Sequence, residues 1–209
     1  MSREQLALRL LSSEGFIDGK KLQTGRIKVE EWRRLADAAA SISTANLLIN
    51  DDASLTVADM NAQCRRLQNL GLVVIDYIQL MQSASGSRGN QGENRVQIVS
   101  EISRMMKIMA KELNVPVVCL SQLSRANEAR QNKRPLLSDL RESGAIEQDA
   151  DVVIGLYRDD YYNRESESHN IAECIVLKNR RGETGVIELQ WIPEYTIFSS
   201  LERQHSEET

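Results

Sequence analysis

The sequence has few of the residues that build metal sites and disulfide frameworks. It contains two histidines and three cysteines in 209 residues. Cys64, Cys119 and Cys174 lie far apart inside apolar segments, which is typical of reduced core thiols in a reducing compartment. His169 and His205 both fall in polar stretches. Neither a disulfide framework nor a His/Cys metal site is therefore expected.

Long apolar runs are also missing. No run approaches the ~20 residues that a membrane span needs, and the N-terminus has no signal-peptide core. We therefore expect a cytoplasmic protein without membrane contact. The composition, 41% hydrophobic and 27% charged, excludes disordered and collagen-like classes. A net charge of −4 argues against nucleic-acid binding through the overall field but leaves room for a local basic surface.

One stretch organises the rest of the chain. Within residues 72–77, an apolar run rich in β-branched side chains ends at Ile75 and is followed by Asp76. Such a run predicts a strand covered on both faces, as in the parallel sheet of an α/β protein. Ligands of these sheets bind outside the carboxyl ends of the strands, where Asp76 would lie. From the residues alone, an aspartate that caps the following helix explains Asp76 equally well.

Periodicity elsewhere predicts alternating helices and strands, followed by a meander. The expected helices cover residues 3–13, 29–43, 56 to about 71, and 93–113, the last with a methionine stripe that indicates core filler. The expected strands cover residues 46–50, 72–77, 117–120, 152–157, 173–177, 186–191 and 195–198. The second buried strand again ends in polar residues, Ser121 and Gln122. We therefore expect an α/β core with an appended antiparallel meander.

Several segments closely resemble the DnaB-type replicative DNA helicases. They are residues 73–81, 115–125, 138–153 and 178–185, and the resemblance extends over essentially the whole chain. It implies a RecA-like P-loop NTPase core, with a mostly parallel sheet, helices on both faces and a C-terminal antiparallel meander, working as a ring of six subunits. Residues 1–201 would then be one partial motor domain and residues 202–209 a polar tail.

The resemblance also implies a nucleotide site. Asp76 matches the Walker-B carboxylate that holds the Mg²⁺ of MgATP through water, a task for which a strand end fixes the carboxylate rigidly. Gln122 matches the sensor glutamine, whose amide can both donate and accept. Arg180 matches the arginine finger that reaches ATP on the adjacent subunit, with Lys178 beside it. These four residues are the expected catalytic set, and Asp76 is the expected metal ligand.

A DNA-binding loop is implied by the same resemblance. Arg141, Glu142 and Gly144 match the loop that grips single-stranded DNA along its backbone, so binding would be independent of sequence and sensitive to salt. The residues between the second and third core strands add further positive charge. Arg125, Arg130, Lys133 and Arg134 either extend the same surface or form a solvated loop.

The sequence departs from the family in one large respect. It contains no Gly-x-x-x-x-Gly-Lys-Ser/Thr loop. The resemblance places that loop and the catalytic glutamate ahead of Met1, and places the P-loop strand between the strand ending at Gln122 and the strand at 152–157. The N-terminal strands of the core would then be missing. We expect a gap in the sheet, and weak or no ATP binding by the chain alone.

The leading hypothesis is the C-terminal part of a hexameric, ATP-dependent replicative helicase that moves along single-stranded DNA and unwinds the duplex at the fork. Its expected cofactors are ATP and Mg²⁺. Its expected partners are single-stranded DNA, five further copies of itself, and a helicase loader and primase. Two alternatives stand beside it. One is another RecA-type ATPase, such as a recombinase or a clock-like hexamer, and the other is a truncated, non-hydrolysing subunit or interaction module.

Overall fold

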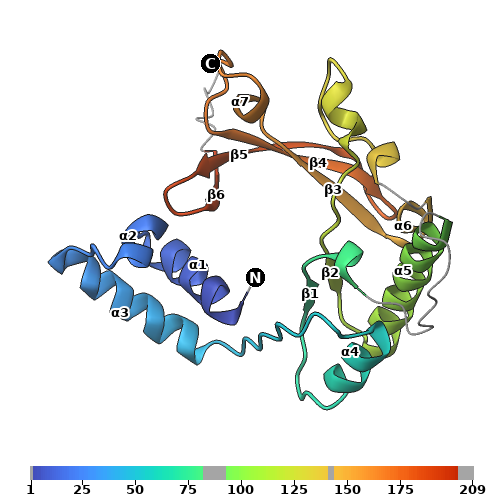
Figure 1. Ribbon diagram of the computed structural model, residues 1–209, viewed down its shortest axis with the longest axis horizontal. Coiled ribbons are helices and arrows are strands. Elements are labelled where there is room, and N and C mark those ends of the chain that lie inside the picture. Colours follow the sequence, from blue (N-terminus) through green and yellow to red (C-terminus); the bar gives the residue numbers. More distant parts are fainter. Residues whose placement is uncertain (1, 82–92, 141–143, 202–209) are drawn as a thin grey trace, which may run out of the picture. The chain divides into compact units, whose positions relative to one another are not determined.

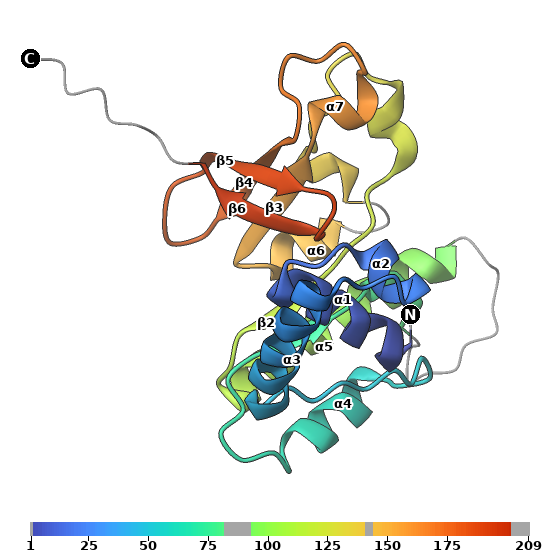
Figure 2. The ribbon, with the colours of Figure 1, turned by 90° about the vertical axis from the view of Figure 1, so that its left-hand side faces the viewer.

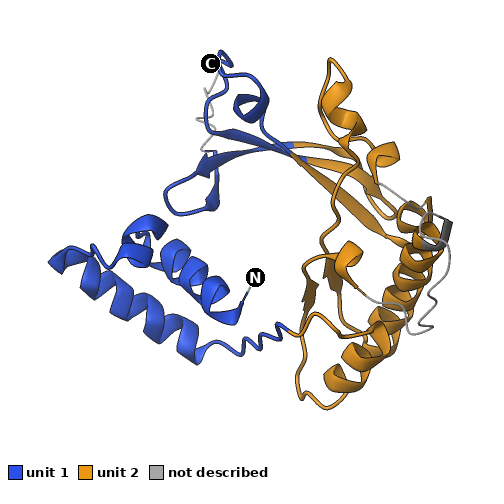
Figure 3. Cartoon of the chain, in the orientation of Figure 1, with its two compact units in different colours: residues 1–51, 157–174, 187–209 blue, residues 52–156, 175–186 orange. Residues whose placement is uncertain are grey.

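The computed structural model describes residues 2–81, 93–140 and 144–201. The chain divides into two compact units, shown in Figure 3. Unit 1 comprises residues 1–51, 157–174 and 187–209, and unit 2 comprises residues 52–156 and 175–186. The expectation of a single motor domain over residues 1–201 stays a prediction. Every described residue of the expected nucleotide site lies in unit 2.

Unit 2 is built around a pair of parallel strands. The strands are β1 (Val73–Ile75) and β2 (Val117–Cys119). The helices are α4 (Val57–Cys64), α5 (Glu93–Leu113) and α6 (Gly144–Asp149), with the short 3-10 helices η1 (Ile78–Leu80), η2 (Arg125–Ala129) and η3 (Leu137–Asp139). Ile75 packs into a core with Val99 and Ile102 of α5. Met106 and Met109 belong to this core, which confirms the methionine stripe as core filler.

The two faces of the β1–β2 pair differ. Alternate side chains of a strand point to opposite faces. Ile75 is buried against α5, whereas Val74 is 61% exposed and Leu120, which follows β2, is 49% exposed. The sequence predicted burial on both faces. In the part of the chain that the structure describes, helices cover one of them.

A second sheet contains the remaining described strands in the order β3-β4-β5-β6. These strands are labelled in Figure 1 and Figure 2. They are β3 (Val152–Tyr157), β4 (Ile171–Asn179), β5 (Gly185–Ile192) and β6 (Ile197–Ser200). Hydrogen bonds join the end of one strand to the start of the preceding one, Arg180 N to Asp151 O (2.8 Å) and Trp191 N to Asn170 O (2.7 Å). This is the antiparallel meander that the sequence predicted, and it starts one strand earlier.

The segment between β2 and β3 packs closely on β3. A Cβ atom built on Gly155 would lie 2.8 Å from Cβ of Pro135 and 3.2 Å from Cδ1 of Leu177. Such distances leave no room for a side chain. Position 155 therefore requires glycine, because Pro135 and Leu177 approach its backbone closely. Pro135 itself is buried.

Unit 1 begins with three helices, α1 (Arg3–Gly15), α2 (Gly19–Thr24) and α3 (Val29–Thr44), and also contains α7 (Asp159–Tyr162). Ser2 and Gln5 form a capping box that starts α1. Ile17 is fully buried. The ring of Phe16 meets Tyr195 edge to face at 5.7 Å, so the residues before β6 pack within the same unit. The expected helices at 3–13 and 29–43 are confirmed.

Two expectations from periodicity are wrong. Residues 46–50 form no strand, and Leu48 is 72% exposed. A strand persists only where another strand satisfies its backbone groups, and none of the described strands pairs with this segment. The helix expected to reach residue 71 ends at Cys64. Turns follow at residues 65–66 and 68–69, and Asn69 has a φ of 58°.

The longest helix that the structure describes is α5, with 21 residues. Neither α5 nor any other helix in the described ranges is long and apolar enough to cross a membrane.

Candidate functional site

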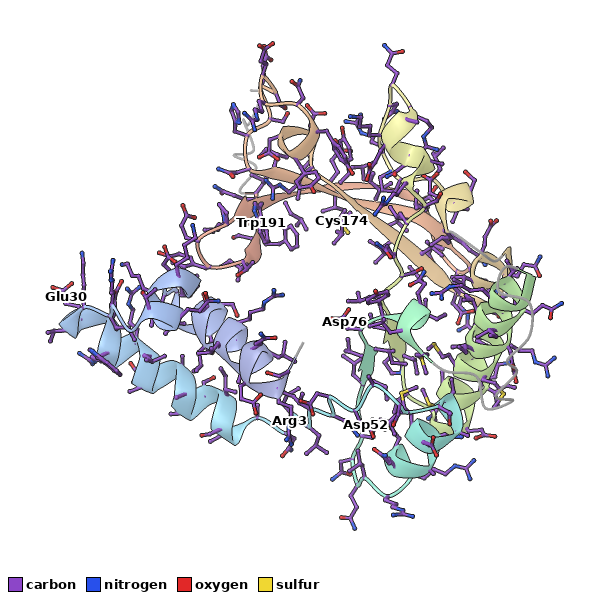
Figure 4. All side chains as sticks on the ribbon, viewed as in Figure 1. Arg3, Glu30, Asp52, Asp76, Cys174 and Trp191 are labelled. Atoms are coloured by element: carbon purple, nitrogen blue, oxygen red, sulfur yellow. The ribbon has the colours of Figure 1, made fainter. Side chains whose placement is uncertain are left out.

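Asp76 and Gln122 lie at the same edge of the β1–β2 pair. The register sets Ile75 opposite Cys119, and Leu120 N donates to Ile75 O at 2.9 Å. Asp76, labelled in Figure 4, follows β1 directly, and Gln122 comes three residues after β2. Both side chains are exposed. The structure therefore brings these two predicted residues to one strand edge, as the strand-end pattern indicated.

Gln79 joins the two strand ends through its side-chain amide. Its Nε2 donates to Gln122 O (3.2 Å) and to Ser121 Oγ (3.0 Å), and its Oε1 accepts from Gln122 N (3.1 Å). Sequence reasoning did not single out this residue. The available signal was an amide three residues after the strand-end carboxylate, inside the segment that carries the family resemblance.

The thiol nearest to Asp76 is held in its neutral form. Burial raises the pKa of Cys119 to about 11, and the negative charge of Asp76 acts in the same direction. Burial also raises the pKa of Cys64. All three cysteines are free, so the expectation of unbridged thiols is confirmed. Neutral thiols are poor nucleophiles and poor metal ligands, so the Cys119 thiol does not compete with the Asp76 carboxylate for a cation.

The donor set at the strand edge suits Mg²⁺ bound together with a phosphate-bearing ligand. Within the described ranges no three His, Cys, Asp or Glu residues gather into a metal-binding group. Mg²⁺ in nucleotide sites is held by one or two carboxylates, with phosphate oxygens and water completing its shell. A single exposed carboxylate at a strand end, Asp76, fits that arrangement. It fits the tetrahedral cage of a structural zinc site poorly.

Lys178 lies at the end of β4 and caps α6. Its ammonium group donates to the carbonyl oxygens of Ala150 (2.8 Å) and Glu147. These carbonyls lie at the C-terminal end of α6, where the helix leaves acceptors unpaired and where positive charge is favourable. Lys178 therefore ties the β4–β5 hairpin to α6.

Arg180 contacts Asp151 in two ways. Its backbone N–H donates to Asp151 O, and its guanidinium donates to Asp151 Oδ1 at 3.2 Å. Lys107 of α5 binds the same carboxylate. The pKa of Asp151 lies below its usual value. The hydrogen bond from Lys107 contributes most to this shift, and the positive charges of Arg180 and Arg181 contribute less. Because both partners are more than half exposed, the pair is solvent-screened and weak, and Arg180 is free to exchange it for another anion.

The structure describes only part of the predicted DNA loop. Arg141 and Glu142 lie outside the described residues. Gly144 is exposed at the first position of α6, and a Cβ atom there would meet none of the described residues within 4 Å. Packing against the described part of the chain therefore does not require glycine at this position.

The basic residues between β2 and β3 do not act as one group. Arg130 binds the buried carboxylate of Asp139 through both terminal nitrogens, one of them at 3.1 Å. The same carboxylate accepts from Leu136 N at 2.8 Å. Arg130 thus holds this segment in place, a role outside the two alternatives that the sequence left open. Arg125, by contrast, is exposed.

A parallel strand pair with a carboxylate and an amide at its carboxyl edge defines the class, an α/β domain with a ligand site at the ends of its strands. The comparison with known families is more specific. Residues 1–200 match the DnaB-like helicase C terminal domain family, and the chain belongs to that family. Membership decides against the recombinase and clock-like alternatives.

Two curated relatives illustrate the similarity. The chain is 51% identical over 210 residues to the replicative DNA helicase DnaB of Geobacillus stearothermophilus, covering 99% of this chain and 45% of that protein. It is 48% identical over 207 residues to the replicative DNA helicase DnaC of Bacillus subtilis, covering 98% of this chain and 45% of that protein. The chain thus spans about half the length of these relatives.

Two solved structures are similar in fold. One, described as a DnaB-like replicative helicase and its interactions with primase, has a TM-score of 0.90 at 42% identity, covering 97% of this chain and 49% of that one. The other, described as an ATPase domain, has a TM-score of 0.89 at 42% identity, covering 97% of this chain and 72% of that one. At this level of identity, both the RecA-like fold class and the family are shown.

Proposed function

We propose that this chain is the C-terminal part of the motor of a hexameric, ATP-dependent replicative DNA helicase. The observation that carries the proposal is that Asp76 and Gln122 follow two paired parallel strands, with Gln79 bonded to the backbone of Gln122, in a chain of this helicase family. The complete protein would translocate along single-stranded DNA and unwind the duplex ahead of it, in the cytoplasm.

In this proposal Asp76 holds the Mg²⁺ of MgATP, through water or directly. MgATP supplies the γ-phosphoryl group whose transfer to water drives translocation. The 209 residues contain no Gly-x-x-x-x-Gly-Lys-Ser/Thr sequence, so the phosphate-cradling loop comes from a segment outside them. The exposed amide of Gln122, one strand away from Asp76, orients water or the γ-phosphate.

Arg180 acts on the neighbouring subunit in this proposal. Its exchangeable pair with Asp151 leaves the guanidinium able to turn toward the phosphates of an adjacent copy, where charge develops in the transition state. Lys178 keeps the hairpin in position through α6 and, with Arg180, completes the catalytic set. A site completed by a second copy explains why a ring, here a homo-hexamer, would be the active form.

Arg141, Glu142 and Gly144 hold the sugar-phosphate backbone of single-stranded DNA in this proposal. The exposed, uncrowded Gly144 supports close approach of a nucleic-acid backbone. A primase, named with one of the solved relatives, and a helicase loader are proposed partners of the complete protein.

The test joins a segment carrying a Gly-x-x-x-x-Gly-Lys-Ser/Thr loop ahead of Met1. We expect ATPase activity that single-stranded DNA stimulates, and strand displacement on a forked duplex. Asp76→Asn should abolish turnover, because the amide holds Mg²⁺ far less well than the carboxylate. Asp37→Asn, at an exposed position of α3, removes the same charge and should keep full activity. ATPase without strand displacement would refute the helicase assignment, and normal turnover in Asp76→Asn would refute the Mg²⁺ role.

A further inference from the structure

We propose that Gln79 is a positioning residue that couples the Mg²⁺-binding end of β1 to the DNA-binding segment, by clamping the backbone of Gln122. This inference rests on the proposed function. Gln79 contacts neither expected ligand; it acts through the residues on either side of it.

The side-chain hydrogen bonds of Gln79 extend the pairing of the two segments beyond their last backbone–backbone hydrogen bond. The backbone bonds between the two strands finish with Leu120 N to Ile75 O (2.9 Å) and Ile78 N to Leu120 O (3.0 Å). Two residues further along, Gln79 Nε2 donates to Gln122 O and Gln79 Oε1 accepts from Gln122 N. A primary amide is the side-chain group that can do both, because it carries a donor and an acceptor side by side. The contact is to the backbone of Gln122, which leaves its side-chain amide available to a ligand.

Gln79 is itself held firmly. It lies in the short η1 helix, where Ile78 is 3% exposed in the core of unit 2. The guanidinium of Arg95 on α5 donates to the carbonyl of Gln79 at 3.1 Å. A side chain anchored in this way transmits a displacement of the β1 end to Gln122, since packed elements move together.

Beyond Gln122 the contacts lead toward the predicted DNA loop. Leu123 and Leu140 form a β-bridge, and Ser124 N donates to Asp139 O at 2.8 Å. Residue 140 directly precedes Arg141, the first residue expected to contact DNA. A contiguous path of hydrogen bonds and covalent links thus runs from Asp76 through Gln79 and Gln122 to the start of that loop. It provides a physical route by which the state of the nucleotide changes the grip on DNA.

The first arm of the test uses the 209-residue chain and measures hydrogen exchange at the backbone amide of Gln122. Gln79→Ala removes the acceptor, so we expect exchange at this amide to become roughly tenfold faster, the scale of one lost hydrogen bond. Gln79→Glu keeps an acceptor and removes both donors, so exchange should stay near that of the parent chain. Gln68→Glu, at an exposed turn position of unit 2, introduces the same charge as a control. Unchanged exchange in Gln79→Ala overturns the clamp.

The second arm uses the protein completed with the phosphate-binding segment. In Gln79→Ala the DNA-stimulated ATPase rate should fall about tenfold more than the DNA-free rate, while the KM for ATP stays within about twofold. Gln79→Glu, which retains half of the clamp, should lie between Gln79→Ala and the parent. An equal loss of DNA-free and DNA-stimulated rates would indicate a merely structural role and overturn the coupling. If the parent protein has no ATPase activity, both the proposed function and the coupling fail. The hydrogen-exchange measurement still tests separately whether Gln79 binds the backbone of Gln122.

Discussion

Unit 2 contains two ion pairs between an arginine and an aspartate that differ in how deeply they are buried. Asp139 is buried, with 4% of its side chain exposed, and Arg130 binds it with both terminal nitrogens while keeping 31% of its own side chain exposed. Asp151 and Arg180 keep 57% and 55% of their side chains exposed, and one guanidinium nitrogen reaches one carboxylate oxygen.

This difference in burial separates a structural pair from an exchangeable one. Removing one partner of a buried pair leaves an uncompensated charge out of water, whereas an exposed pair is screened and each partner is readily solvated. The segment that follows Gln122 therefore stays in place through Arg130 and Asp139. Arg180, the predicted finger, rests on Asp151 in a contact that costs little to leave.

The largest expected effect comes from removing Arg180, the arginine of the exposed pair. In the completed ring, Arg180→Ala should lower ATP turnover by about 10³-fold or more, because the developing phosphoryl charge loses its guanidinium. Its free energy of unfolding should stay within about 1 kcal/mol of the parent, as for other exposed pairs. Steady-state ATPase and urea unfolding measure the two quantities. Arg181→Ala, at the neighbouring exposed position, is the matched control, and equal losses in both variants would rule out a specific finger.

The next effect concerns the buried pair. Asp139→Ala leaves Arg130 without its carboxylate and Leu136 N without its acceptor. We expect the free energy of unfolding to fall by about 2–3 kcal/mol, below the usual range for a fully buried pair because Arg130 is partly exposed. Urea unfolding of the 209-residue chain measures it. Asp151→Ala serves as control, with an expected loss under about 1 kcal/mol. Similar losses in the two variants would contradict the distinction drawn from burial.

A third prediction tests the same segment where it packs on β3. Gly155→Ala places a methyl group 2.8 Å from the rigid ring of Pro135, so the segment must shift. Overpacking of this kind costs about 1–3 kcal/mol of unfolding free energy. Gly144→Ala, whose added methyl group meets no atom of the described residues within 4 Å, should leave thermal stability unchanged. A Gly155→Ala chain with parental stability would show that the contact is loose.

The smallest effect is the pH dependence of the exchangeable pair. Because Lys107 and Arg180 lower the pKa of Asp151, its ion pairs stabilise the folded chain fully above the unfolded-state pKa, about 3.9. That contribution is lost as the pH falls through the lower folded-state value. The parent should therefore exceed Asp151→Asn slightly in unfolding free energy at pH 7, and the difference should vanish at low pH. A difference that grows with acid would have the wrong sign.

Much of the site could be predicted from sequence because strand ends are local features. A β-branched run that stops at a polar residue locates Asp76, the family resemblance selects Gln122 after the second such run, and parallel pairing brings such ends to one edge. The role of Gln79 could not be found in this way, because its partner lies 43 residues further along the chain. The strand expected at residues 46–50 failed for a related reason, since a strand needs a neighbour that a local pattern cannot supply.

By itself, the sequence determined the elements of the core, the family, and the residues that stand at the strand ends. These follow from periodicity and from motifs whose members are close together in the chain. Only the tertiary structure decided which polar partner each charged side chain takes and how deeply the pair is buried. Arg130 and Arg180 carry the same guanidinium group, and their ion pairs differ in strength because burial changes the free energy of an ion pair.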